Sequence, residues 1–242
     1  MSGINFADVL WRMQEGFMKE KDNYIGRFRA FENVFNYFQE GQTVAQIACG
    51  SIPEDLFLTM ERVGREGRII LIDRDPAFVY NRMSEILGVK NVFKGEEFYT
   101  QTKEFYTQTE EGKQVLKNLF SEANIEAYIQ RLPPYPEQIK DASIDHVMAI
   151  NAAFELMGSP MGEGPPDFEG LITETYKKLR KDGGLIVQGI MYEDIDFFGV
   201  HVHDITEDKG LSFEEDYILQ ERLEGHFSYA GRGYWARWVK KE

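Results

Sequence analysis

Residues 43–73 read TVAQIACGSIPEDLFLTMERVGREGRIILID, and this stretch decides the fold. It predicts, in order, a buried strand, a tight glycine turn, a helix, a second turn and a second buried strand that ends in a carboxylate. Pro53 suits the first turn of the helix, and Gly64 and Gly67 end it. A strand, helix and strand in this order form half of a nucleotide-binding α/β sheet.

The two strand ends carry residue types that suit a nucleoside ligand. The turn at Cys49, Gly50 and Ser51 would bring backbone N–H groups and a helix N-terminus up to the ligand. Asp73, one strand over, can accept hydrogen bonds from a ribose diol. We therefore expect an adenosine-containing cofactor.

Composition narrows the class of protein. The chain has 242 residues, 43% of them hydrophobic, and a net charge of −14. This length fits one large α/β domain with additions or two small domains, and the apolar content supports a packed core. An acidic surface repels nucleic acid, so we expect a small-molecule or cationic substrate.

The longest apolar runs, such as Ile69–Ile72, are too short to cross a bilayer, so no membrane contact is expected. The single cysteine and an N-terminus without a signal-peptide pattern predict a cytoplasmic location.

Two segments depart from the strand–helix alternation. Apolar spacing predicts helices over residues 4–40, interpreted as an N-terminal cover on a domain that spans 41–242. Residues 91–124 contain EFYTQT twice, at 97–102 and 104–109, and predict a helical insertion. Elsewhere, strands are expected at 44–48, 68–73, 125–130, 143–150, 185–189, 217–227 and 234–240, and helices at 53–63, 76–87 and 168–180. The last two strands, joined by a short link, are expected to be antiparallel neighbours.

The run Gln46–Ile52, QIACGSI, resembles a known cofactor motif. The class I S-adenosylmethionine-dependent methyltransferases carry acid-hydrophobic-Gly-x-Gly-x-Gly at this place. Only the middle glycine is present here, at Gly50, and Gln46 replaces the acid that usually helps to hold the cofactor's ammonium group. Glutamine can still accept a hydrogen bond but brings no charge.

Three further runs resemble this family in the right order. Ile69–Asp73 is similar to its strand that ends in a ribose-binding acid, Asp141–Val147 to its D-x-S-F-D-x-V, and Tyr176–Gly184 to its R-x-L-K-P-G-G. The resemblance extends from about Thr43 to the C-terminus. It implies an α/β, Rossmann-like, seven-stranded methyltransferase sheet with helices on both faces and the last strand antiparallel, and S-adenosyl-L-methionine as the cofactor.

The resemblance and the strand ends together select the candidate site residues, because ligands of such sheets lie beyond the carboxyl ends of the strands. The expected cofactor-binding residues are Gln46, Ala48, Cys49, Gly50, Ser51, Asp73, Arg74, Gln130, Arg131 and Asn151. Asn151–Phe154 occupies the place where amino-methylating relatives carry Asn/Asp-Pro-Pro-Tyr/Phe, so Asn151 is also a catalytic candidate.

His201 and Tyr24 are the other catalytic candidates, His201 as a general base near the substrate and Tyr24 in the N-terminal cover. In an extended segment His201 and His203 would share one face, which suits a metal site. No third ligand stands at a set spacing, so we expect no metal.

The expected activity is transfer of a methyl group to an N or O nucleophile of a small molecule. An NAD-binding sheet is a less suitable interpretation, since the G-x-G-x-x-G turn is absent. Gly50–Pro53 also resembles the G-P-L-P turn of nicotianamine-synthase-like proteins, which transfer the aminocarboxypropyl arm of the same cofactor. A non-catalytic binding or scaffold protein is the third alternative. Whether the chain forms a homodimer is left open.

Overall fold

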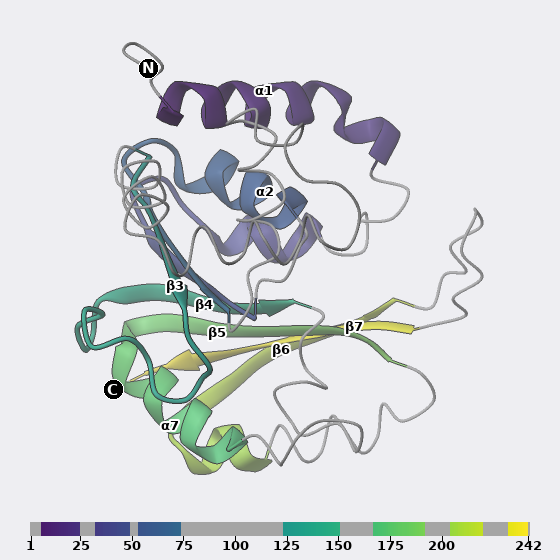
Figure 1. Cartoon of the computed structure of the whole chain (residues 1–242). Helices are drawn as coiled ribbons and strands as arrows, with labels where there is room; N and C mark the ends of the chain where they lie inside the picture. The colour runs from purple at the N-terminus through teal and green to yellow at the C-terminus, as the bar shows by residue number, and fades with distance from the viewer. Residues whose placement is uncertain are drawn as a thin grey trace, which may run out of the picture.

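A computed structural model describes residues 6–24, 32–48, 53–73, 123–150, 167–191, 204–219 and 232–241. A single sheet forms the middle layer, with α1 and α2 over one face and α7 against the other (Figure 1). The elements are α1 (Phe6–Tyr24), the 3-10 helix η2 (Glu32–Tyr37), β1 (Thr43–Ile47), α2 (Pro53–Val63), β2 (Arg68–Asp73), β3 (Ile125–Ile129), β4 (Ile144–Ile150), α7 (Phe168–Lys178), β5 (Leu179–Met191), β6 (Leu211–Leu219) and β7 (Arg232–Lys240).

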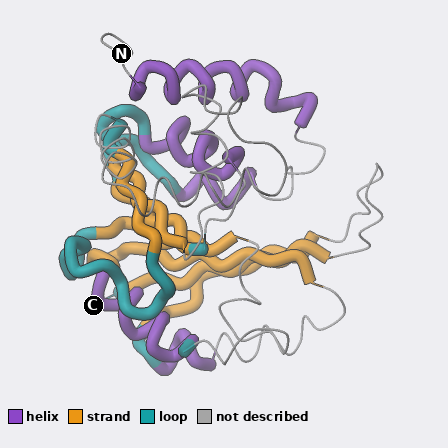
Figure 2. Tube along the Cα trace, in the orientation of Figure 1, coloured by secondary structure: helices purple, strands orange, loops and turns teal. Residues whose placement is uncertain are grey.

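The sheet has seven strands in the order β3-β2-β1-β4-β5-β7-β6. Neighbours from β3 to β5 are parallel, whereas β7 is antiparallel to both β5 and β6. Figure 2 shows these strands as one continuous layer between helices. The predicted Rossmann-like sheet of seven strands with an antiparallel last strand and helices on both faces is confirmed.

The central strands are buried on both faces because successive side chains point to opposite layers. Val44 and Leu71 belong to the apolar cluster beneath α1, η2 and α2, whereas Ala45 and Ile70 belong to the cluster beneath α7. All five residues of β1 are buried. This two-sided burial explains why residues 69–72 of β2 form a continuous apolar run in the sequence.

The N-terminal cover rests on α2. Phe17 of α1 packs on Phe57 with ring centroids 5.6 Å apart, and Gln14 Nε2 donates to Glu61 at 2.7 Å. Helix α2 in turn buries Leu56 and other apolar side chains against the sheet. Within the described residues, no helix has the length and apolar content needed to cross a bilayer.

Most predicted elements agree with the structure, and two boundaries do not. The bounds of α2 and β2 match the prediction. The strand predicted over 217–227 is wrong at its start, because β6 begins at Leu211. The predicted 185–189 strand is also too short, since β5 runs over Leu179–Met191 and resumes its register with β4 at Gly184. The predicted helices after Pro76 and within 91–124, including both EFYTQT copies, lie outside the described residues.

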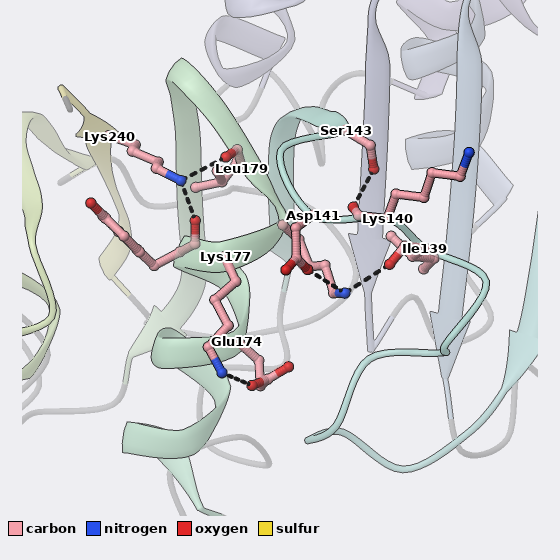
Figure 3. Close-up of polar contacts among 10 residues, drawn as sticks. Ile139, Lys140, Asp141, Ser143, Glu174, Lys177, Leu179 and Lys240 are labelled. Atoms are coloured by element: carbon pink, nitrogen blue, oxygen red, sulfur yellow. Dashed lines mark hydrogen bonds and ion pairs between the residues drawn. The ribbon is translucent and has the colours of Figure 1, made fainter.

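Lysine side chains close the end of α7 at the edge of the sheet where β4 and β5 begin (Figure 3). Lys240 Nζ donates to the carbonyl oxygens of Tyr176 and Leu179, at 2.9 and 3.0 Å. Lys178 Nζ donates to Ile139 O at 2.7 Å and Asp141 Oδ1 at 2.8 Å. Cationic donors at the C-terminus of a helix satisfy carbonyls that have no intrahelical partner. The run Tyr176–Gly184 thus has a structural role.

Asp145, from the run Asp141–Val147, joins two strands at the same edge. Its Oδ2 accepts a hydrogen bond from Thr43 N at 2.7 Å, and its Oδ1 accepts from Arg180 Nη1 at 3.1 Å. The carboxylate therefore connects the start of β1 to β4 and β5. This run too serves the fold, at the opposite end of the strands from the expected ligand.

A buried histidine and arginine lie side by side under η2. His146 is 4% exposed and packs on Phe38 with ring centroids 5.3 Å apart. Arg237 forms an ion pair with Glu214, and its guanidinium carbon lies 4.5 Å from the centre of the Tyr37 ring. Burial, and secondarily the charge of Arg237, lowers the pKa of His146 to about 4.

We predict that His146 makes stability fall as the pH falls from 7 to 5. The unfolded state, with a histidine pKa near 6.5, takes up a proton before the folded state does, so acid favours unfolding. The expected loss between pH 7 and pH 5 is roughly 2 kcal/mol of unfolding free energy. The loss continues at lower pH and is complete only below the folded pKa of about 4. Urea unfolding at both pH values would measure it. The His146→Gln variant should lose less stability over this interval than wild type, and an equal loss in both would contradict the assignment.

Candidate functional site

The chain reverses its strand order at β1. From β1 it proceeds outward through β2 and β3, and then returns to place β4 on the other side of β1. In open α/β sheets, ligands bind outside the carboxyl ends of the strands at such a reversal. Because β1, β2, β3 and β4 are parallel, Ala48, Asp73 and Gln130 all lie at this carboxyl edge.

Ala48, directly after β1, has a left-handed backbone with φ of +50°. For an alanine this conformation costs about 1–2 kcal/mol. Its N–H donates to Ile72 O at 2.7 Å, which holds it against the end of β2. Ala48 stands at the first glycine position of the motif described above. The structure supplies the reason for a glycine there: the backbone turns in a region that side chains disfavour.

Asp73 and Gln130 are brought together where β2 and β3 end. Gln130 N donates to Asp73 O at 2.9 Å, and Asp73 is in register with Ile129. The side chain of Gln130 donates from Nε2 to Pro134 O at 2.6 Å, which ties the proline-rich loop to the strand end. Asp73 is partly exposed and Arg131 is exposed. This corner therefore carries a carboxylate at the end of β2 and a cation just after the end of β3.

Gln46 is directed toward α2. It is buried, and its Nε2 donates to Thr59 Oγ1 at 2.7 Å and to Asp55 O at 3.0 Å. Thr59 Oγ1 donates in turn to Asp55 O at 2.9 Å. Sequence reasoning missed Asp55 and Thr59. Their spacing of one helical turn was a usable signal, because it places both on one face of the helix that follows Gln46.

Of the remaining predicted site residues, Tyr24 is the last residue of α1. Six of the predicted residues lie outside the part of the chain that the structure describes: Cys49, Gly50, Ser51, Arg74, Asn151 and His201. His203, the other member of the histidine pair, also lies outside it. Among the described residues, no group of three His, Cys, Asp or Glu side chains is arranged to hold a metal ion.

Comparison with known proteins identifies the fold. No protein-family model matches the sequence, and no curated relative matches it. Solved structures do match. A SAM-dependent methyltransferase from Aquifex aeolicus is 13% identical, with a TM-score of 0.52 over 97% of this chain and 98% of that one. A candidate methyltransferase from Bacillus halodurans is 11% identical, with a TM-score of 0.51 over 88% of this chain and 99% of that one.

A candidate methyltransferase from Thermoplasma acidophilum also matches at a TM-score of 0.50, with 11% identity over 85% of this chain and 70% of that one. At these identities the likeness concerns the fold. The chain has the class I methyltransferase fold, and the resemblance inferred from the four sequence runs is confirmed at that level.

We predict that Ala48→Gly stabilises the protein by about 0.5–1 kcal/mol. Glycine adopts a positive φ without steric cost, so the substitution relieves the backbone strain at position 48. The free energy gained exceeds the extra entropic cost of ordering a more flexible chain on folding. Chemical denaturation would measure the difference. Ala45→Gly is the matched control, because the same change in buried β1 removes a packed methyl group and should destabilise. Destabilisation by both substitutions would contradict the strain assigned to Ala48.

Proposed function

We propose that the protein is an S-adenosylmethionine-dependent methyltransferase that acts on an N or O nucleophile of a small molecule. One observation carries this proposal: the left-handed turn at Ala48 is hydrogen-bonded to the end of β2, beside Asp73, at the strand-order reversal of a class I methyltransferase sheet. This combination is what a bound nucleoside requires at that edge.

The described residues fit such a cofactor. A carboxylate at position 73 has acceptor capacity for both hydroxyls of a ribose. Helix α2 begins at Pro53, five positions after Ala48, and we propose that the N–H groups of its first turn face the same edge. We propose that the turn Cys49–Ser51 approaches the cofactor through its backbone, and that Arg74, Gln130 and Arg131 border the adenine.

The bound cofactor would supply an electrophilic methyl group, so the chain has to align the acceptor and exclude water. We propose that Asn151, the residue after β4 in the sequence, accepts a hydrogen bond from an acceptor amine. We propose His201 as the general base for an acceptor that must lose a proton. We propose that Tyr24 and the rest of the N-terminal cover, residues 1–40, border the part of the site where the methyl acceptor binds.

The net charge of −14 supports a neutral or cationic acceptor, because a negative surface repels anionic partners and attracts cationic ones. For the same reason we propose neither nucleic acid nor a membrane surface as the partner. The single cysteine favours a cytoplasmic setting.

We predict that Asp73→Ala weakens binding of S-adenosylhomocysteine by about 1–3 kcal/mol, because it removes charge-assisted hydrogen bonds to the ribose. Isothermal titration calorimetry would measure the affinity. Asp141→Ala is the control, since this exposed carboxylate lies where β4 begins, at the other end of the strands. Equal affinity of wild type and Asp73→Ala would remove Asp73 from the site, and absence of heat with wild type at millimolar ligand would favour a scaffold protein.

Product analysis tests the reaction itself. Incubation with S-adenosylmethionine and candidate acceptors should accumulate S-adenosylhomocysteine. Accumulation of methylthioadenosine would assign the chain to aminocarboxypropyl transfer and overturn the proposed methyl transfer.

A further inference from the structure

We infer that Gln46 is a positioning residue that fixes the start of α2 against β1, and that it does not serve as a contact for the cofactor's ammonium group. The claim about the ammonium group rests on the proposed function. The claim that Gln46 positions α2 follows from contacts within the described residues.

The Nε2 group of the buried Gln46 side chain is bonded to α2. Only 4% of the residue is exposed, and both hydrogen bonds of Nε2 go to the first two turns of α2. Thr59, which is fully buried, completes a triangle of hydrogen bonds with Gln46 and the carbonyl of Asp55. Separating buried polar groups that are joined in this way costs free energy. A group that lost its partner would have no water molecule to replace the hydrogen bond.

These contacts bracket the cofactor turn. On its N-terminal side, Ala48 is held to β2 through its N–H. On its C-terminal side, Asp55 is the third residue of α2, and its carbonyl oxygen accepts a hydrogen bond from Gln46 of β1. Both ends of residues 49–52 are therefore attached to the central strands. The position of the helix N-terminus, and of the N–H groups that would face a ligand, depends on this attachment.

The triangle also explains why this chain departs from the acid of the family motif. A carboxylate at position 46 would put an oxygen about 3.0 Å from the carbonyl oxygen of Asp55, where the amide now puts a donor. Two acceptors at that separation repel, and a buried carboxylate has no water to compensate. An amide at position 46 therefore matches the polar groups of α2 better than a carboxylate would.

The two roles predict opposite results for Gln46→Glu. If Gln46 positions α2, the introduced carboxyl has a raised pKa, because only its protonated form can donate to Asp55 O. At pH 8 the variant should then unfold roughly 4–10 °C below wild type, and this deficit should shrink as the pH is lowered to 5, because the folded state gains the proton first. Comparison with wild type at each pH cancels the contribution of His146. Gln39→Glu is the control: it adds the same charge at an exposed position and should show no such deficit.

Calorimetry with S-adenosylhomocysteine supplies the second measurement. The positioning role predicts that Gln46→Glu binds about tenfold more weakly than wild type at pH 8 and recovers toward pH 5. Tighter binding by the variant at pH 8, lost on acidification, would show that a carboxylate there contacts the ammonium group and would overturn the inference. A variant as stable as wild type at every pH would overturn it as well. If wild type itself binds no S-adenosylhomocysteine, the proposed function fails, and the unfolding series alone decides whether Gln46 positions α2.

Discussion

The attachment of the β1 end to β2 is the constraint on which the candidate site depends. Ala48 keeps an unfavourable backbone conformation because its N–H is bonded to Ile72 O and the strand before it is buried on both sides. A residue can remain in a sparsely populated conformation only where its surroundings hold it there. The two apolar clusters on either face of the sheet provide that support, and the turn toward α2 follows from it.

Much of the fold could be predicted because local signals agreed with burial. Helix α2 opens at a proline and closes before Gly64, and β2 is an apolar run between a glycine and an acid. The start of β6 could not be predicted from such local signals. Its first half contains Phe213, which is exposed, followed by acidic residues, so it resembles a polar loop. Pairing with β7, which a local sequence pattern does not reveal, makes it a strand.

The candidate site was predictable in part for the same kind of reason. Parallel strands bring their carboxyl ends to one edge, so the nearness of Ala48 and Asp73 follows from the order of elements alone. The orientation of Gln46 does not follow from it, because a strand residue in a fully buried layer can meet either face. Its choice depends on Asp55 and Thr59, which only the packing of α2 brings within hydrogen-bonding distance.

The internal place of β7 has a consequence for biosynthesis. This strand follows β6 along the chain, yet it lies between β5 and β6 and carries the lysine that closes α7. While the ribosome is still elongating the polypeptide, β5 has an unpaired edge and β6 has no neighbour to join. A nascent chain that stalls before residue 232 exposes that edge to other molecules. Synthesis of β7 therefore pairs the edge of β5 and brings β6 into the sheet.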